Sequence, residues 1–178
     1  MRPSDAKFLF EFLLPQLRSE QAVTQRILAA VPPTGVDYKP GEKSMTAFEV
    51  ARHIVVCEIW FLDAIITGQF AEEAARPALS ATTCQALADW YATSARERLP
   101  LLEQLSTDDL AREVDYIGLR HDPAVAYLNI AIRHTAHHRG QLSAYLRGMG
   151  ARVPAIYVES ADEPYPTTDG SDVVPPAF

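Results

Sequence analysis

The feature that most limits how this chain can fold is a set of four long segments whose apolar residues recur at helical spacing. These segments cover residues 5–31, 46–68, 83–105 and 122–147. Strand-like alternation is almost absent, and no internal repeat is visible. Because amphipathic helices of this length bury their apolar faces against one another, we predict an all-α protein folded as a four-helix bundle.

The 178 residues are predicted to form a single domain, with the bundle at about 5–150 and an irregular tail at about 151–178. Five of the thirteen prolines fall in the tail, which predicts an extended segment along the domain surface. Residues 69–82 are a predicted linker with room for a short helical turn, and 107–120 are predicted to be irregular or briefly extended. The loop at 35–43 and the link before the fourth helix are long enough for a crossover.

The second helix has recognisable boundary signals at both ends. Ser44 or Thr46 is its predicted N-cap, and Thr46 with Glu49 has the spacing of a capping box. Gly68 suits the position just after the last helical residue. The sequence therefore predicts a helix that begins near residue 46 and ends at 68.

Prolines modify the other three predicted helices. Pro15 must kink the first helix or mark its true start, and Pro100 interrupts or bends the third. In the fourth helix, Pro123 suits the first helical position and Asp122 is the predicted N-cap.

Charge and cysteine content exclude several classes of partner. The chain carries 16 Lys and Arg residues against 23 Asp and Glu residues, a net charge of -7. This charge repels phosphate backbones, so we predict no nucleic-acid partner, and a salt-sensitive gel shift with duplex DNA would contradict that prediction. No apolar run approaches a membrane span and no signal segment fits the charged start, so we predict no membrane partner. Cys57 and Cys84 indicate reduced thiols in a cytoplasmic protein.

Three of the five histidines, His134, His137 and His138, crowd one part of the fourth predicted helix. Since side chains advance about 100° per residue, His134 and His138 fall inside the apolar stripe and His137 lies at its rim. Two imidazoles at i and i+4 can reach one metal ion from a single helix face. The alternative is a pair of core histidines hydrogen-bonded to tyrosine or backbone groups, since a buried imidazole needs partners for both nitrogens.

The second predicted helix offers a third histidine, because His53 shares a face with Cys57, Trp60 and Ala64. Three protein ligands plus water make the open, catalytic type of metal site. Cys57 could be a fourth ligand that closes the site, although a buried free cysteine is more often a small apolar side chain. Since three histidines suffice, we expect Cys57→Ser to retain the metal. His121 precedes the fourth helix and is predicted to be solvated.

Other features of the fourth helix point toward an interface. Arg133, Arg139 and Arg147 project from its polar flank, where surface or interface ion pairs are expected. Gly140 costs about 1 kcal/mol relative to Ala inside a helix, which we attribute to close approach of a neighbouring helix or subunit. We therefore predict a homodimer through a face that includes the second or fourth helix, a state that light scattering tests.

The histidine segments carry a family resemblance. The fourth helix reads HTAHHRGQL at 134–142, followed by YLR at 145–147 and GARVP at 150–154, and the second reads ARHI at 51–54 after DYKP and KSMT at 37–46. Together with IY at 156–157 and SAD at 160–162, these runs resemble the DinB-like metalloenzyme family over about residues 10–162. The chain departs from that pattern after Tyr157, where Val158-Glu159-Ser160 replaces the commoner Gly-Pro-Ser.

This resemblance implies an up-down-down-up bundle, often a homodimer, with zinc or nickel held by three histidines. Carried onto this chain, the implied ligands are His53, His134 and His138, whereas His137 belongs to the motif without being a usual ligand. The family includes thiol-dependent enzymes that use mycothiol, bacillithiol or glutathione. The implied partners are a small-molecule substrate and a low-molecular-weight thiol.

Three functions stay open from the sequence. The first is a metal-dependent thiol transferase, because a divalent cation lowers the pKa of a bound thiol and polarises an electrophile. The second is a metal-dependent hydrolase that uses water, and the third is a non-enzymatic protein that binds a metal or small ligand. The first two need the same three ligands, and the third gains if Cys57 closes the ligand set.

Overall fold

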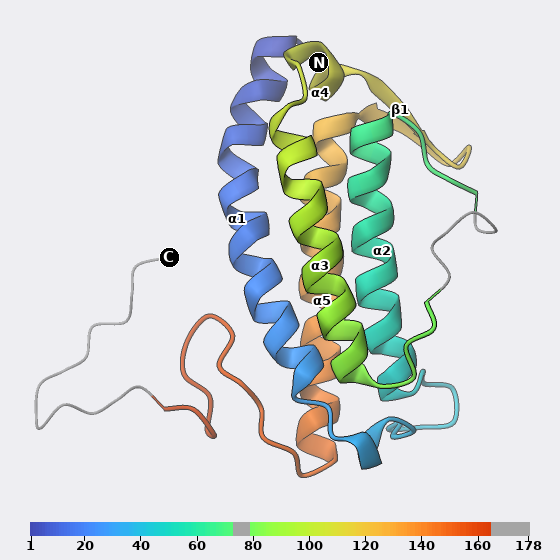
Figure 1. Ribbon diagram of the computed structural model, residues 1–178, viewed down its shortest axis with the longest axis vertical. Helices are drawn as coiled ribbons and strands as arrows, with labels where there is room; N and C mark the ends of the chain where they lie inside the picture. The colour runs from blue at the N-terminus through green and yellow to red at the C-terminus, as the bar shows by residue number, and fades with distance from the viewer. Residues whose placement is uncertain (73–78, 165–178) are drawn as a thin grey trace, which may run out of the picture.

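The computed structural model describes residues 1–72 and 79–164. Four long helices dominate this part of the chain (Figure 1): α1 (Pro3–Ala29), α2 (Ala47–Thr67), α3 (Cys84–Glu103) and α5 (Ala124–Gly148). The smaller elements are the 3₁₀ helix η1 (Pro33–Gly35), the short helix α4 (Thr107–Ala111) and the strands β1 (Glu113–Tyr116) and β2 (Arg120–Pro123). The predicted all-α four-helix bundle is confirmed.

The order of helix directions matches the predicted up-down-down-up topology. Figure 1 shows α1 and α5 running one way along the bundle and α2 and α3 running the other way. Helix α5 packs against α1 and α2, and α3 packs against the same two helices. Because α2 and α3 are parallel, the crossover joins these two helices. Our placement of a crossover at 35–43 or before the fourth helix is therefore wrong.

The ends of α2 are built as the sequence predicts. Thr46 Oγ1 accepts from the backbone N–H of Glu49 at 3.2 Å, and Glu49 Oε2 accepts from the backbone N–H of Thr46 at 2.7 Å. This reciprocal capping box satisfies two N–H groups that the first turn leaves without a helical partner. Gly68 ends the helix with φ at 83°, the left-handed conformation that glycine adopts without strain.

Replacing Thr46 with alanine is expected to lower the free energy of unfolding by about 1 kcal/mol, because the cap hydroxyl is lost. For a chain of this size the melting temperature should fall by about 2–4 °C. Ser44→Ala is the matched control, since Thr46 is the residue that caps α2. Thermal melts of the two variants check the prediction, and an equal loss in Ser44→Ala would contradict it.

Both helical prolines lie inside continuous helices. The first helix begins at Pro3 and passes through Pro15, so Pro15 does not mark its start, and α3 passes through Pro100. Phe8 and Phe12, which belong to the apolar pattern of the first helix, are 70% and 62% exposed. The buried face of α1 instead carries residues such as Phe10, Leu13, Leu14, Leu17 and Ile27.

The link before α5 holds the short helix α4 and a β-hairpin, so the predicted brief extended stretch is present and the short helix was not predicted. β1 and β2 pair antiparallel, and the turn between them places Ile117 and Gly118 at positive φ. Asp122 lies in β2 and does not cap α5, whose N-cap residue is Pro123 with no side-chain hydrogen bond. The predicted N-cap is wrong because Asp122 lies opposite Val114 in the β1–β2 pair, and its carboxylate forms an ion pair with Arg120.

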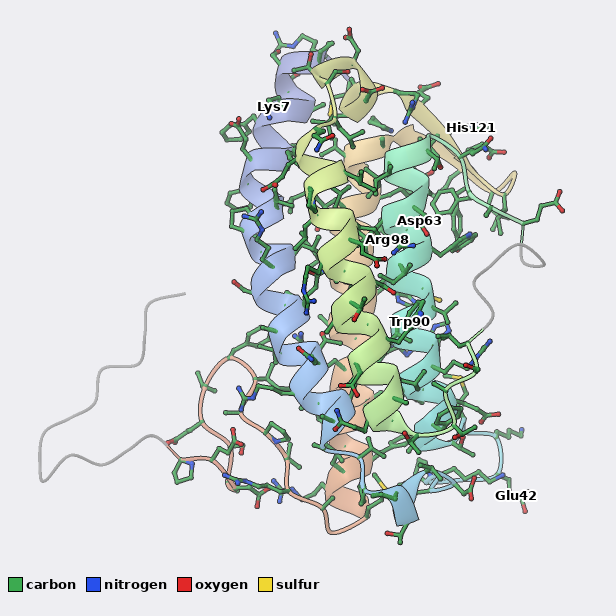
Figure 2. The ribbon with its side chains drawn as sticks, viewed as in Figure 1. Lys7, Glu42, Asp63, Trp90, Arg98 and His121 are labelled. Atoms are coloured by element: carbon green, nitrogen blue, oxygen red, sulfur yellow. The ribbon has the colours of Figure 1, made fainter. Side chains whose placement is uncertain are left out.

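Side-chain contacts between helices fix the bundle and the described part of the tail. Figure 2 labels Asp63 of α2 and Arg98 of α3, which form a two-pronged ion pair with N–O distances of 2.6 and 2.9 Å. Residues 151–164 lie against the bundle, where Asp162 pairs with Arg147 at 2.8 Å. Up to residue 164 the tail is irregular, as predicted, but it is not extended, because it folds back on itself at the Ser160–Glu163 bridge. The rest of the tail and the helical turn expected within 69–82 fall wholly or partly outside the described residues.

Across residues 1–72 and 79–164, none of the helices is both long enough and apolar enough to cross a membrane.

Candidate metal centre

Three imidazole rings from two neighbouring helices converge on one point of the bundle. His53 comes from α2, and His134 and His138 come from successive turns of α5. The ring centroids of His53 lie 4.9 Å from His134 and 4.5 Å from His138, and those of His134 and His138 are 4.6 Å apart. The structure therefore brings together all three histidines that the sequence singled out.

The nitrogens of two of these rings face each other directly. His53 Nε2 and His134 Nε2 are 3.1 Å apart. Cys57 Sγ lies 3.5 Å from His53 Nδ1, and one ligand atom each from His53, Cys57 and His134 can be chosen within 4.8 Å of one another. This group of two nitrogens and one sulfur has the donor chemistry of a zinc-type site.

His138 is oriented by a hydrogen-bond chain along α5. Its Nδ1 lies 2.9 Å from Gln141 Oε1, and Gln141 Nε2 donates to the hydroxyl of Tyr145 at 3.1 Å. Because an amide oxygen only accepts, Nδ1 carries the proton and Nε2 keeps its lone pair. Histidine ligands of metals commonly have this kind of outer hydrogen bond, which fixes the tautomer. The role of Gln141 was not predicted from the sequence, although its i+3 spacing from His138 is visible there.

Burial keeps His134 in the form that a metal needs. Burial first, and then the neighbouring His138, His53 and His137, lower the pKa of His134 to about 4. The imidazole is therefore neutral near pH 7 and has a lone pair to offer. Its Nδ1 is also buried without a hydrogen-bond partner in the described part of the chain. A shared cation fits this cluster, since His53 Nε2 and His134 Nε2 face each other and could each give it a lone pair.

The low pKa of His134 predicts that the metal-free protein loses stability when the pH falls from about 6.5 toward 4. The unfolded chain has an ordinary histidine pKa near 6.5, so it binds a proton before the folded chain does. The free energy of unfolding should therefore drop through that window and be fully retained above it. Urea unfolding in a chelating buffer at several pH values measures the effect. His134→Gln should flatten the dependence, whereas an unchanged slope in that variant would contradict the assignment.

The other two histidines, His137 and His121, are exposed, whereas His53, His134 and His138 are half-buried. The centroid of the His137 ring lies 4.8 Å from that of the His138 ring. His121 is exposed on β2, where Nε2 lies 3.8 Å from Asp115 Oδ1. Neither residue belongs to the group of converging nitrogens.

A buried carboxylate behind the histidines was not found from the sequence. Glu58 of α2 is fully buried, and its Oε1 accepts from Gln21 Nε2 at 2.9 Å and from the Tyr91 hydroxyl at 2.8 Å. Its Oε2 accepts from the Thr135 hydroxyl at 2.7 Å. Burial raises the pKa of Glu58, while the hydrogen bonds from Gln21, Thr135 and Tyr91 act in the opposite direction. These four residues come from all four long helices.

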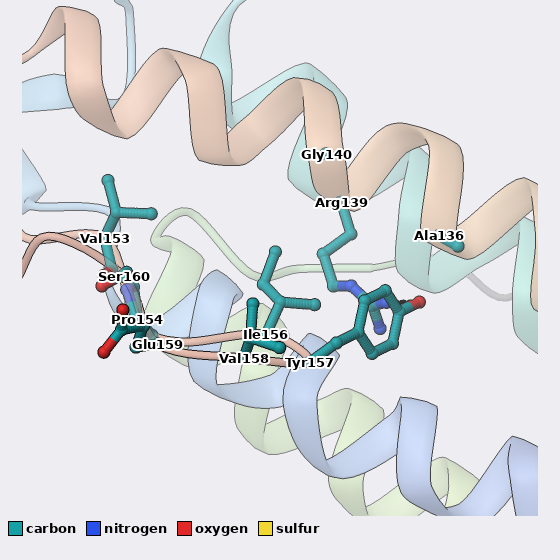
Figure 3. Close-up of a pocket in the computed structure, with 10 residues that line it drawn as sticks. All are labelled: Ala136, Arg139, Gly140, Val153, Pro154, Ile156, Tyr157, Val158, Glu159 and Ser160. Carbon is teal, nitrogen blue, oxygen red and sulfur yellow. Dashed lines mark hydrogen bonds between the residues drawn. The ribbon is translucent and has the colours of Figure 1, made fainter. Parts of the chain in front are cut away.

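Arg139 is buried, so our prediction of a surface arginine at this position is wrong. Figure 3 shows its side chain pointing from α5 toward Tyr157 of the tail. The guanidinium donates to the Tyr157 hydroxyl at 2.6 Å and to Thr24 Oγ1 at 3.2 Å, and it forms an ion pair with Glu20. These contacts close one end of a cavity of about 290 Å³ between α5 and the tail. The predicted surface positions of Arg133 and Arg147 are correct.

Gly140 lies at the same cavity, and a methyl group there would meet no atom of the described chain within 4 Å. Close approach of a helix of this chain therefore does not explain the glycine. Its role at a subunit interface stays a prediction.

The family follows from a comparison over nearly the whole chain. The model of the DinB family matches residues 7–169, a range that contains α2, α3, α5, all of α1 after its first turn, and the three histidines. This chain belongs to the DinB family. The DinB family that the histidine motifs indicated is thus confirmed, whereas the metal and the activity that the resemblance implies stay predictions.

Relatives and solved structures of DinB-like proteins agree with this assignment. The uncharacterized protein YjoA of Bacillus subtilis (strain 168) is 31% identical over 134 residues, which cover 74% of this chain and 85% of YjoA. The crystal structure of that DinB-like protein matches with a TM-score of 0.69 at 29% identity, covering 81% of this chain and 96% of YjoA. A DinB-like protein from Bacillus cereus ATCC 10987 matches with a TM-score of 0.69 at 26% identity, covering 83% and 97%.

Proposed function

We propose that this DinB-family protein is a divalent-metal-dependent enzyme that activates a low-molecular-weight thiol for transfer to a small electrophile. The observation that carries the proposal is the convergence of three imidazole rings from two helices, with ring centroids no more than 4.9 Å apart. The proposed ligands are His53, His134 and His138. Zinc and nickel are the proposed metals, since both accept imidazole nitrogens readily.

The residues of this chain prepare the site before any ion binds. His134 is held neutral by burial, and His138 is held by Gln141 with its Nε2 lone pair available. The hydrogen bond between Glu58 and Thr135 joins α2 to α5 beside His134, so the two ligand-bearing helices keep their relative position. A divalent cation bound here would lower the pKa of a coordinated thiol or water and would polarise an electrophile.

Two observations favour a small thiol as the cosubstrate. The resemblance places the chain near thiol-dependent enzymes, and the donor set includes a sulfur, which is typical of sites that accept soft ligands. The alternative is a hydrolase that uses water at the same three histidines. The proposed partners are thus a small molecule and a thiol, with a second copy of the chain as the proposed dimer partner.

Metal analysis combined with a conjugation screen tests the proposal. Purified protein loaded with zinc or nickel is offered glutathione, bacillithiol or mycothiol together with 1-chloro-2,4-dinitrobenzene, and thioether formation is followed. We expect metal-dependent conjugation that a chelator abolishes and that Cys84→Ser retains. Metal-dependent hydrolysis of a p-nitrophenyl ester without any thiol would instead favour the hydrolase. Failure to bind a stoichiometric metal would overturn both.

A further inference from the structure

Cys57 stands in a different environment from the other cysteine. Cys84 packs within the main apolar core, where burial raises the pKa of its thiol to about 11. Cys57 is also buried, with 9% of its surface exposed, but it differs from Cys84 in having an imidazole beside its sulfur. Its sulfur faces the imidazole of His53 one turn earlier on α2. Cys57 is therefore a buried thiol whose sulfur adjoins a candidate metal ligand.

The distances around Cys57 are those of atoms that share a ligand sphere. Zinc–nitrogen and zinc–sulfur bonds of about 2.0–2.1 and 2.3 Å place tetrahedral ligand atoms roughly 3.3 Å (N to N) and 3.6 Å (N to S) apart. The observed separations are 3.1 Å between the Nε2 atoms of His53 and His134, and 3.9 Å between Cys57 Sγ and His53 Nε2. Shifts of a few tenths of an ångström would bring His53, His134 and Cys57 to these separations.

We propose that Cys57 is a fourth ligand of the metal centre, an inference that rests on the proposed function of His53, His134 and His138. On ligation the thiol proton leaves to solvent and no redox partner is needed. Three histidines still hold the ion when the sulfur is removed, so Cys57 completes the ligand set without being essential for binding. With Cys57 bound, a small thiol would reach the ion as a fifth ligand or by displacing the Cys57 sulfur, so the position of Cys57 is one that accepts sulfur.

Cobalt provides a direct test, because thiolate coordination to Co²⁺ produces an intense near-ultraviolet charge-transfer band that nitrogen ligands do not. The protein is loaded with Co²⁺ in a phosphine reductant, so that no other thiol is present. We expect one Co²⁺ per chain and the charge-transfer band in the wild type. Cys57→Ser should keep the Co²⁺ stoichiometry and lose the band. Cys84→Ser is the matched control and should keep both.

Removing the side chain tests the preference for sulfur. Cobalt-loaded Cys57→Ala should regain the charge-transfer band on addition of 2-mercaptoethanol, because the small thiol enters the space left by Cys57. Absence of regain would refute that preference. A wild-type spectrum with bound Co²⁺ and no charge-transfer band would show that Cys57 only hydrogen-bonds to His53, and the proposed function would survive. No Co²⁺ binding at all would overturn the proposed function itself.

Discussion

Replacing His134 with alanine is expected to abolish stoichiometric metal binding while the bundle stays folded. His134 lies within 5 Å of both other rings, and its Nε2 faces that of His53. Loss of an outer-sphere partner typically weakens metal binding by roughly 10–100-fold, so removal of a ligand should exceed that loss. Helix packing dominates the stability of a bundle of this size, unlike that of a zinc finger. Metal content after gel filtration and a thermal melt measure the two effects.

The matched control for this variant is His137→Ala on the same helix. His137 is exposed and its ring lies beside that of His138, outside the group of close ligand atoms, so its removal should leave the metal content unchanged. His53→Ala and His138→Ala should behave like His134→Ala. Full metal retention in His134→Ala, or loss in His137→Ala alone, would show that a different face of α5 carries the ligands.

The histidine cluster could be predicted from the sequence because its residues follow the helical period. His134 and His138 are four residues apart, and His53 shares its face with apolar neighbours, so a helical wheel places all three on buried faces. The wheel misplaced Arg139, however. The apolar residues alone centred the buried face on the histidines, whereas the buried face of α5 extends further round to include Thr135 and Arg139.

The polar residues of the interior escaped prediction for a physical reason. Periodicity assigns a polar side chain to the surface, and only a partner from another helix reveals that it is buried. Glu58 depends on Gln21, Tyr91 and Thr135, which lie 33 to 77 residues away in the chain. No local pattern encodes such contacts. The pairing of β1 with β2 was missed in the same way, since strands of four residues are too short for their sequence to indicate the register.

The same pair of helices carries both the buried carboxylate and the histidines. Glu58 directly follows Cys57 on α2, and Thr135 directly follows His134 on α5. The 2.7 Å hydrogen bond between Glu58 and Thr135 therefore joins the residue next to Cys57 on α2 to the residue next to His134 on α5. A fully satisfied polar network of this kind favours one packing arrangement of the helices over others. The stability of the bundle and the geometry of the site are thus coupled through Glu58.

Glu58→Ala is expected to be the most destabilising single change in this chain. It leaves three buried donors without their acceptor and opens a cavity where α1, α2, α3 and α5 meet. An unsatisfied buried group costs about 1–3 kcal/mol, and we expect a combined loss of about 4 kcal/mol in the free energy of unfolding. That is a large part of the roughly 5–15 kcal/mol that stabilises a typical domain. The melting temperature should fall by about 8–16 °C.

Two further variants separate this network from a simple volume effect. Glu58→Gln keeps the shape and the acceptor oxygen, and its new N–H can donate to the Thr135 hydroxyl, so the loss should be much smaller. Glu103→Ala removes a half-exposed carboxylate that pairs with Arg18, and it should change the melting temperature little. Circular dichroism melts and urea titrations of the three variants supply the numbers. If Glu58→Gln destabilised as much as Glu58→Ala, the negative charge itself, and not the hydrogen-bond geometry, would be what holds the four helices together.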